Sequence, residues 1–220
     1  ATDDRDHFVA SGRARRDVLP IVEGKLLSPF RVDLDRADKA IPIAVAERLL
    51  DRKASARDRI AYRDVASATN KLTLIAALLP AGVVSTHTVF VSKTCLDERD
   101  QWCLLGLLNS WVANFLVRAQ VMTHVTTTLM ARLPVPRPAA RSAVFEDLRG
   151  LSQTLARDGV ERAVNEYARL NAITALEYGL TRDQFHYVTT TFPLIDVVIR
   201  EQALAEFDLL IDRSVLPRFQ

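Results

Sequence analysis

Residues 63–80 read RDVASATNKLTLIAALLP, and this stretch decides the fold because it joins a polar turn to an apolar strand. The polar turn is Thr69–Lys71, where a threonine and an asparagine favour turn geometry over a regular element. Thr73–Leu79 is a run of apolar and β-branched residues with the length of a strand. Pro80–Gly82 then forms a second turn. We therefore expect a strand between two turns at the centre of a mixed α/β region.

The front half of the chain carries further segments of the same kind. The expected strands are Val18–Val22, Arg59–Val65 and Val83–Ser92, and Ile43–Leu50 is expected to be a short helix. Because Pro80–Gly82 is short, we expect Thr73–Leu79 and Val83–Ser92 to be adjacent antiparallel strands.

A long helix is predicted to follow these strands. It begins at Asp97, whose acidic first turn suits the helix dipole, and its apolar face continues at helical spacing to Phe115. Asn109, Ser110 and Asn114 interrupt the apolar pattern. We expect these three residues on the helix flank or packed against a neighbouring element.

The rest of the chain is predicted to be almost entirely helical. The proline-rich segment Leu133–Pro138 is extended, because a residue before proline avoids the α region. The helices expected after it are Val144–Ala156, Val160–Glu177, one that Thr181 and Gln184 begin as a capping box after Gly179, and Leu194–Leu210. The fold class is therefore α+β: a mixed α/β domain over residues 1–137, followed by a helical subdomain over residues 138–220.

The charge of the chain is uneven, although its net value is only +2. Residues 1–145 carry 21 basic against 15 acidic side chains, whereas residues 146–220 carry 8 against 12. A basic front half is compatible with a polyanionic partner. No apolar run approaches the length of a membrane span, and the acidic start Ala1–Asp6 is unlike a signal peptide, so we expect a cytoplasmic protein with no membrane partner.

Motifs for catalysis or metal binding are missing from the sequence. It has no Gly-x-Gly turn, no Pro-Pro pair, no phosphate-binding lysine motif and no Gly-x-Ser-x-Gly. His87, Cys95 and Cys103 are too widely spaced for a zinc knuckle. We therefore expect no catalytic residue and no metal site in this chain.

Two clusters carry the side chains that suit DNA. Arg57, Arg59 and Arg63 alternate with apolar residues along one expected strand, and the turn Thr69–Lys71 follows. Asparagine pairs with adenine, arginine with guanine, and lysine or threonine more often contacts phosphate. The alternative for Asn70 is a turn residue that hydrogen-bonds its own backbone.

Three phrases in fixed order resemble the target-recognition region of DNA adenine-N6 methyltransferases of the type IIG restriction–modification and related phage-defence kind. The first phrase, residues 63–80, matches at Arg63, Val65, Ala66, Thr69, Asn70, Thr73 and Pro80; the second, residues 104–115, at Asn109 and Ser110; and the third, residues 123–126 followed by Leu133–Pro136, at Thr123, His124 and Thr126. Upstream of these phrases, Glu23, Gly24, Lys25 and Phe30 also match. Leu72 and Met122 stand where the family usually has arginine and glycine. The resemblance covers residues from about 18 to 200.

The resemblance implies that the chain recognises a sequence in duplex DNA for a catalytic domain that lies elsewhere, in the same polypeptide or in a partner subunit. That domain would use S-adenosylmethionine, whereas this chain would bind no cofactor. The residues expected to contact DNA are Lys25, Arg57, Arg59, Arg63, Thr69, Asn70, Lys71, Arg118, Thr123 and His124. The loop 122–128 has packing against the fold as its alternative role.

Two other functions stay open at this stage. One is a separate DNA-specificity or adaptor subunit, and the other is a helical protein-interaction module, which the acidic C-terminal part would suit. The first methionine is Met122, so we expect the chain to be part of a longer polypeptide.

Overall fold

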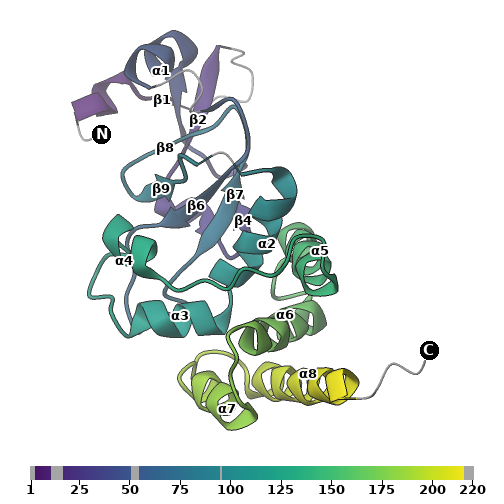
Figure 1. Ribbon diagram of the computed structural model, residues 1–220. Helices are drawn as coiled ribbons and strands as arrows, with labels where there is room; N and C mark the ends of the chain where they lie inside the picture. Colours follow the sequence, from purple (N-terminus) through teal and green to yellow (C-terminus); the bar gives the residue numbers. More distant parts are fainter. Residues whose placement is uncertain (1–2, 11–16, 51–54, 95, 216–220) are drawn as a thin grey trace.

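The computed structural model describes residues 3–10, 17–50, 55–94 and 96–215 of the 220-residue chain. These residues form small β-sheets with one short helix at one end and a group of helices at the other (Figure 1). This arrangement confirms the predicted α+β class.

The front half of the chain consists mainly of short strands, and the back half is helical. The strands are β1 (Val9–Ala10), β2 (Val18–Val22), β3 (Leu27–Ser28), β4 (Arg31–Val32), β5 (Lys39–Pro42), β6 (Arg59–Arg63), β7 (Ala76–Leu79), β8 (Val84–Ser85) and β9 (Val89–Val91). The α-helices are α1 (Ile43–Leu49), α2 (Glu98–Leu108), α3 (Trp111–Arg118), α4 (Thr127–Arg132), α5 (Ala143–Asp158), α6 (Val164–Glu177), α7 (Arg182–Thr190) and α8 (Val197–Val215). Two 3₁₀ turns, Asp3–His7 and Gly24–Leu26, complete the described elements.

The central sheet has the order β7-β6-β9, with both outer strands antiparallel to β6. The predicted adjacency of Thr73–Leu79 and Val83–Ser92 is therefore wrong. A turn closed by Val89 N donating to Thr86 O over 3.1 Å divides the second segment in two. Its first half, β8, pairs in parallel with β2 in another sheet, and its second half, β9, pairs with β6.

The long helix predicted from Asp97 to Phe115 is two helices. Asn109 ends α2, and Ser110 caps α3 by accepting a hydrogen bond from Ala113 N at 3.2 Å. Serine is a preferred N-cap residue, so the chain restarts a helix there even though the apolar spacing continues. The predicted helix start is confirmed, because the Asp97 carboxylate accepts from Asp100 N at 2.7 Å.

The C-terminal helices follow their sequence signals closely. The capping box of Thr181 and Gln184 is formed at the start of α7, and Gly179 adopts the left-handed conformation, with φ of 69°, after α6. α8 begins at Val197, three residues later than predicted, because Leu194–Asp196 still belong to the turn after Pro193.

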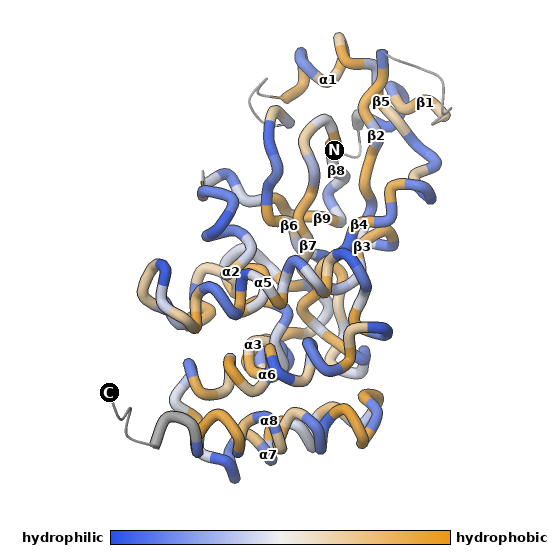
Figure 2. The backbone as a smooth tube through the Cα atoms, turned by 90° about the vertical axis from the view of Figure 1, so that its right-hand side faces the viewer, coloured by the Kyte–Doolittle hydropathy of each residue, from blue (hydrophilic) through white to orange (hydrophobic). Residues whose placement is uncertain are grey.

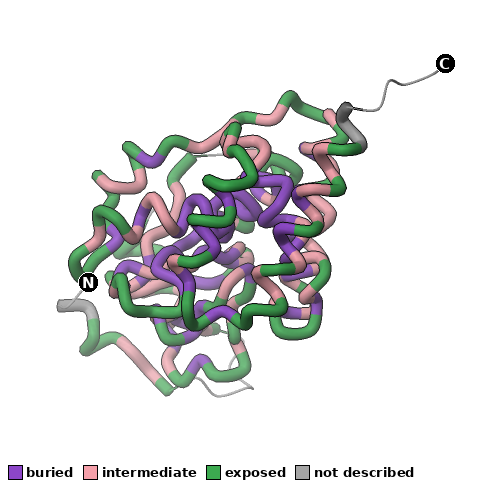
Figure 3. The backbone as a smooth tube through the Cα atoms, turned by 90° about the horizontal axis from the view of Figure 1, so that it is seen from below, coloured by how far each residue is buried: buried purple, intermediate pink, exposed green. Residues whose placement is uncertain are grey.

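The main hydrophobic core joins the central sheet to the C-terminal helices, and two smaller buried clusters lie among the strands. It contains Tyr62 of the central sheet, Trp111 of α3, Leu148 of α5 and Phe207 of α8. In Figure 3 the buried segments gather in the middle of the helices, and Figure 2 shows apolar residues along β2 and over much of α8. This core crosses residues 137 and 138, so the predicted division between two parts lies over one continuous interior.

Within the described part of the chain, no helix is both long and apolar enough to cross a membrane.

Candidate nucleic-acid interface

The first and third sequence phrases lie side by side. Val65 and His124 form an isolated antiparallel bridge. Ala66 N donates to Thr123 O over 3.1 Å, and Val125 N donates to Asp64 O over 2.8 Å. Two segments that are about 60 residues apart in the chain therefore form one short two-stranded unit.

Buried asparagines of the second phrase, residues 104–115, hold the first phrase, residues 63–80, in place. Asn114 Oδ1 accepts from the backbone N–H groups of Thr73, at 2.9 Å, and Leu74, at 2.8 Å. Asn109 makes a matching pair with Ala76, accepting from its N at 3.0 Å and donating to its O at 2.9 Å. Both asparagine side chains are fully buried, so they replace a missing neighbouring strand for residues 73–76. The packing role expected for these asparagines is confirmed.

Arg118 ties the same segment to the C-terminal helices. Its Nε donates to Thr73 Oγ1 at 3.1 Å, and its two terminal nitrogens donate to Thr191 O at 2.7 Å and to Asn70 O at 2.6 Å. The guanidinium also lies 4.3 Å from the centre of the Phe192 ring, and burial lowers its pKa. Arg118 thus shapes the turn Thr69–Lys71 from inside the protein.

Five of the predicted DNA contacts are exposed. They are Thr69, Asn70 and Lys71, which follow the paired segment 64–66 in the chain, and Thr123 and His124, which lie on the segment paired with it. We call these five residues, with the exposed apolar residues Val65 and Met122, the candidate surface. Beside it lies a shallow groove of about 380 Å³, lined by Gln120, Met122, Thr123, His124, Thr126, Thr128, Leu129 and Arg132.

His124 has a fixed orientation on the candidate surface. Its Nδ1 lies 2.9 Å from Asp64 Oδ2, and the carboxylate is mostly buried while the imidazole is half exposed. A carboxylate at Nδ1 holds the ring and leaves Nε2 for an external partner. Asp64 also accepts the backbone bond from Val125, so one residue positions both the ring and its loop.

Arg63 and Arg59 are directed into the protein. Arg63 donates to Gly24 O at 3.0 Å and to Leu27 O at 2.8 Å, whereas Arg59 donates to Val83 O at 3.0 Å. Burial lowers the pKa of both guanidinium groups. These two arginines connect strands, and neither belongs to the candidate surface.

Lys25 and Arg57 also lie apart from the candidate surface. Lys25 Nζ is 3.0 Å from Glu23 and 3.6 Å from Asp38, so acidic side chains offset its charge. Glu23 is shared with Lys39, whose hydrogen bond lowers the pKa of that carboxyl group. Arg57 is exposed next to β6, at the opposite end of the strand from Arg63.

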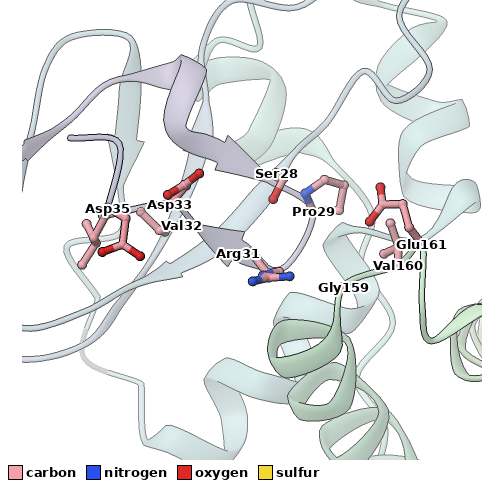
Figure 4. Close-up of a pocket in the computed structure, with 10 residues that line it drawn as sticks. Ser28, Pro29, Arg31, Val32, Asp33, Asp35, Gly159, Val160 and Glu161 are labelled. Carbon is pink, nitrogen blue, oxygen red and sulfur yellow. The ribbon is translucent and has the colours of Figure 1, made fainter. Parts of the chain in front are cut away.

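A larger cavity lies elsewhere and has the wrong charge for DNA. It has a volume of about 490 Å³ and lies between the β3–β4 hairpin and the connection of α5 to α6 (Figure 4). Its charged lining is Arg31 against Asp33, Asp35 and Glu161. Gly159, with φ of 83°, approaches Arg31 so closely that an added Cβ would lie 3.0 Å from the guanidinium. This acidic cavity does not suit a phosphate group.

The structure adds Met122, Val65 and Arg132 to the residues that sequence predicted. Val65 and Met122 lie in the phrases that resemble the family, but apolar side chains gave no reason to expect them on an exposed surface, and Arg132 carried no signal in the sequence. Among the described residues, no group of three metal-ligating side chains comes together. Cys95 lies outside the described residues, and burial raises the pKa of the Cys103 thiol to about 12.

A scan against protein-family models finds no match to this chain, and a search of curated proteins finds no match either.

Proposed function

We propose that the chain recognises duplex DNA for an adenine-N6 DNA methyltransferase of the restriction–modification or related defence kind. The observation that carries this proposal is the pairing of residues 64–66 with residues 123–125, which places Thr123 and His124 beside the segment that leads into the exposed turn Thr69–Lys71. Amide, imidazole, ammonium and hydroxyl groups on adjoining loops are the side chains that contact base edges and phosphates.

The catalytic step belongs outside this chain. The sequence lacks the Gly-rich turn and the Pro-Pro-containing loop that a DNA amino-methyltransferase uses to hold S-adenosylmethionine and the flipped base. We therefore assign this cofactor to a catalytic domain in the same polypeptide or in a partner subunit. The contribution of this chain would be to place the target adenine relative to that domain.

The test is fluorescence anisotropy of the chain with a labelled random-sequence duplex, titrated from low to physiological salt. Lys71→Ala combined with Arg132→Ala should weaken binding at every salt concentration and lower the salt slope by about 2, since each phosphate contact releases about one counterion. Arg48→Ala, an exposed cation on α1, is the matched control and should leave the slope unchanged. If the wild-type chain does not bind at low salt, the proposal fails.

A protein-interaction module is the second candidate, and an apolar groove favours it. This groove, of about 310 Å³, is lined by Leu72, Ile75, Val160, Val164, Ile195 and Ile199 together with Pro29, Lys71, Glu161 and Tyr167. Leu194, Val197 and Val198 are exposed next to Ile195 and Ile199 in the chain. Absence of DNA binding in the anisotropy test, with a stable complex between this chain and a separate methyltransferase subunit, would favour this function instead.

A further inference from the structure

Met122 is the most exposed large hydrophobic side chain in the described residues. It is 88% exposed, compared with 63% for Tyr187, the next in order. Its neighbours in the chain, Thr123 and His124, are polar and exposed. A methionine that projects alone from a polar loop gains free energy only when a partner removes it from water.

The backbone on both sides of Met122 is held before any partner arrives. On one side, Gln120 N and Val121 N donate to Val117 O at the end of α3, over 3.0 and 2.9 Å. On the other side, Thr123 O accepts from Ala66 N, and His124 is bonded to Asp64. The fully buried Val125 then anchors the loop in the core. Insertion of Met122 into a partner would therefore require little ordering of the loop.

The surroundings of Met122 distinguish a nucleic acid from a protein partner. Protein-docking sites are contiguous apolar patches. Six of the eight residues that line the groove beside Met122 carry a hydroxyl, amide, imidazole or guanidinium group, and Arg132 is its cation. These are phosphate- and base-contacting groups. An unbranched, polarizable thioether is among the side chains that DNA-binding proteins insert between base steps.

We propose that Met122 is a wedge that enters the base stack of duplex DNA while Thr123, His124 and Arg132 contact the adjoining nucleotides. This inference rests on the proposed function and adds to it a local unstacking of the duplex by this chain. Val65, whose bridge partner is His124, is the other exposed apolar residue of the candidate surface.

The test compares three duplexes of one sequence in anisotropy titrations: intact, with one mismatch, and with one abasic site. A wedge binds more tightly where stacking is already weakened, so we expect about tenfold preference for the abasic duplex over the intact one. Met122→Ala should reduce this preference to about one, whereas Met122→Leu should keep most of it. Leu209→Ala, an exposed apolar residue on α8, is the control and should bind like wild type.

The outcomes separate the wedge from the proposed function. Binding to all three duplexes with equal affinity, unchanged by Met122→Ala, would overturn the wedge and leave DNA recognition standing. Binding to none of them at low salt would overturn both. As a second measurement, 2-aminopurine placed in the duplex should brighten when wild type binds, because unstacking relieves its quenching, and should brighten less with Met122→Ala.

Discussion

At the scale of single residues, the candidate surface depends on buried amide side chains that make the hydrogen bonds a neighbouring backbone would otherwise make. Asn114 and Asn109 hold residues 73–76 by hydrogen bonds that a neighbouring strand would otherwise provide. Asn171 does the same for α3, accepting from Trp111 N at 2.7 Å. A buried backbone N–H group that has no hydrogen-bond acceptor costs free energy of folding. Each of these asparagines is therefore required as the acceptor for the backbone that it contacts.

Replacing Asn114 by leucine should destabilise the protein strongly. The two N–H groups of Thr73 and Leu74 would lose their acceptor in the core, which costs about 2–6 kcal/mol. Urea unfolding measures the loss, with Asn165→Leu as the control because Asn165 is an exposed residue of α6. We expect less than about 1 kcal/mol for the control. Equal losses in both variants would contradict the structural role of Asn114.

Phe30 provides a second test at this scale. It occupies the third position of the turn between β3 and β4 with φ of 69°, and its ring is buried edge-on against Tyr167, 6.4 Å between centres. Phe30→Ala should cost about 3–5 kcal/mol by removing the ring. Phe30→Gly should be more stable than Phe30→Ala by about 1 kcal/mol, because glycine adopts positive φ without strain. Thermal unfolding of both variants checks the order, and the reverse order would show that no strain is present.

Sequence alone separated exposed from structural residues only in part. It placed Thr69, Asn70, Lys71, Thr123 and His124 among the DNA contacts, and the structure exposes all five. It gave the same role to Arg63 and Arg118, which donate instead to groups of the protein itself, including carbonyl oxygens 36 and 73 residues away. Arginine that crosslinks loops and arginine that contacts phosphate look alike in a sequence, because the partner carbonyl leaves no pattern.

At the scale of elements, two small residues, Ser110 and Gly106, determine how neighbouring helices begin and pack. Ser110 divides one apolar helical pattern into α2 and α3, which no periodicity could reveal. Gly106 of α2 faces Ser152 of α5, where an added Cβ would lie 2.5 Å from the serine Oγ. The strand order could not be predicted from the sequence either, because nothing in Val83–Ser92 shows which half of the segment pairs with which strand.

The contact of α2 with α5 predicts a dependence of one substitution on another. Gly106→Ala should destabilise the protein by about 1 kcal/mol, since overpacking outweighs the gain in helix propensity. In a Ser152→Ala background the clash with Oγ is absent, so the same change should be neutral or stabilising. A double-mutant cycle in urea measures the coupling. A Gly106→Ala effect that is the same in both backgrounds would rule out the contact.

At the scale of the whole molecule, the strand and helix parts share one interior. The core that contains Tyr62 also contains Leu148 and Phe207, from either side of residues 137 and 138. A boundary was predicted at the proline-rich segment because that segment is extended and the chain after it is almost entirely helical. Such signals report the kind of element and carry no information on whether two groups of elements pack together.

The shared core predicts a single cooperative unfolding transition. Trp111 is fully buried between Tyr167 and the rings of Phe185 and Phe192, so in a Trp102→Phe variant, which has no other tryptophan, its fluorescence reports the packing of α3 on the C-terminal helices. Far-ultraviolet circular dichroism reports helices and strands together. We expect the two signals to have the same urea midpoint within error. Two separated midpoints would instead indicate that residues 1–137 and 138–220 unfold as independent domains.

The asparagine bonds to residues 73 and 74 have a consequence for amide hydrogen exchange. These two residues belong to no helix or strand, and such segments usually exchange their amide protons rapidly in deuterated water. Here the protons of Thr73 and Leu74 are released only when α3 moves away from the sheet. They should therefore be protected as strongly as the central strand β6, while Thr69, bonded only to the exposed Ser67 hydroxyl, exchanges quickly. Slow exchange at Thr73 and Leu74, close in the chain to fast exchange at Thr69, would show where the stable core of the protein ends and the exposed loop begins.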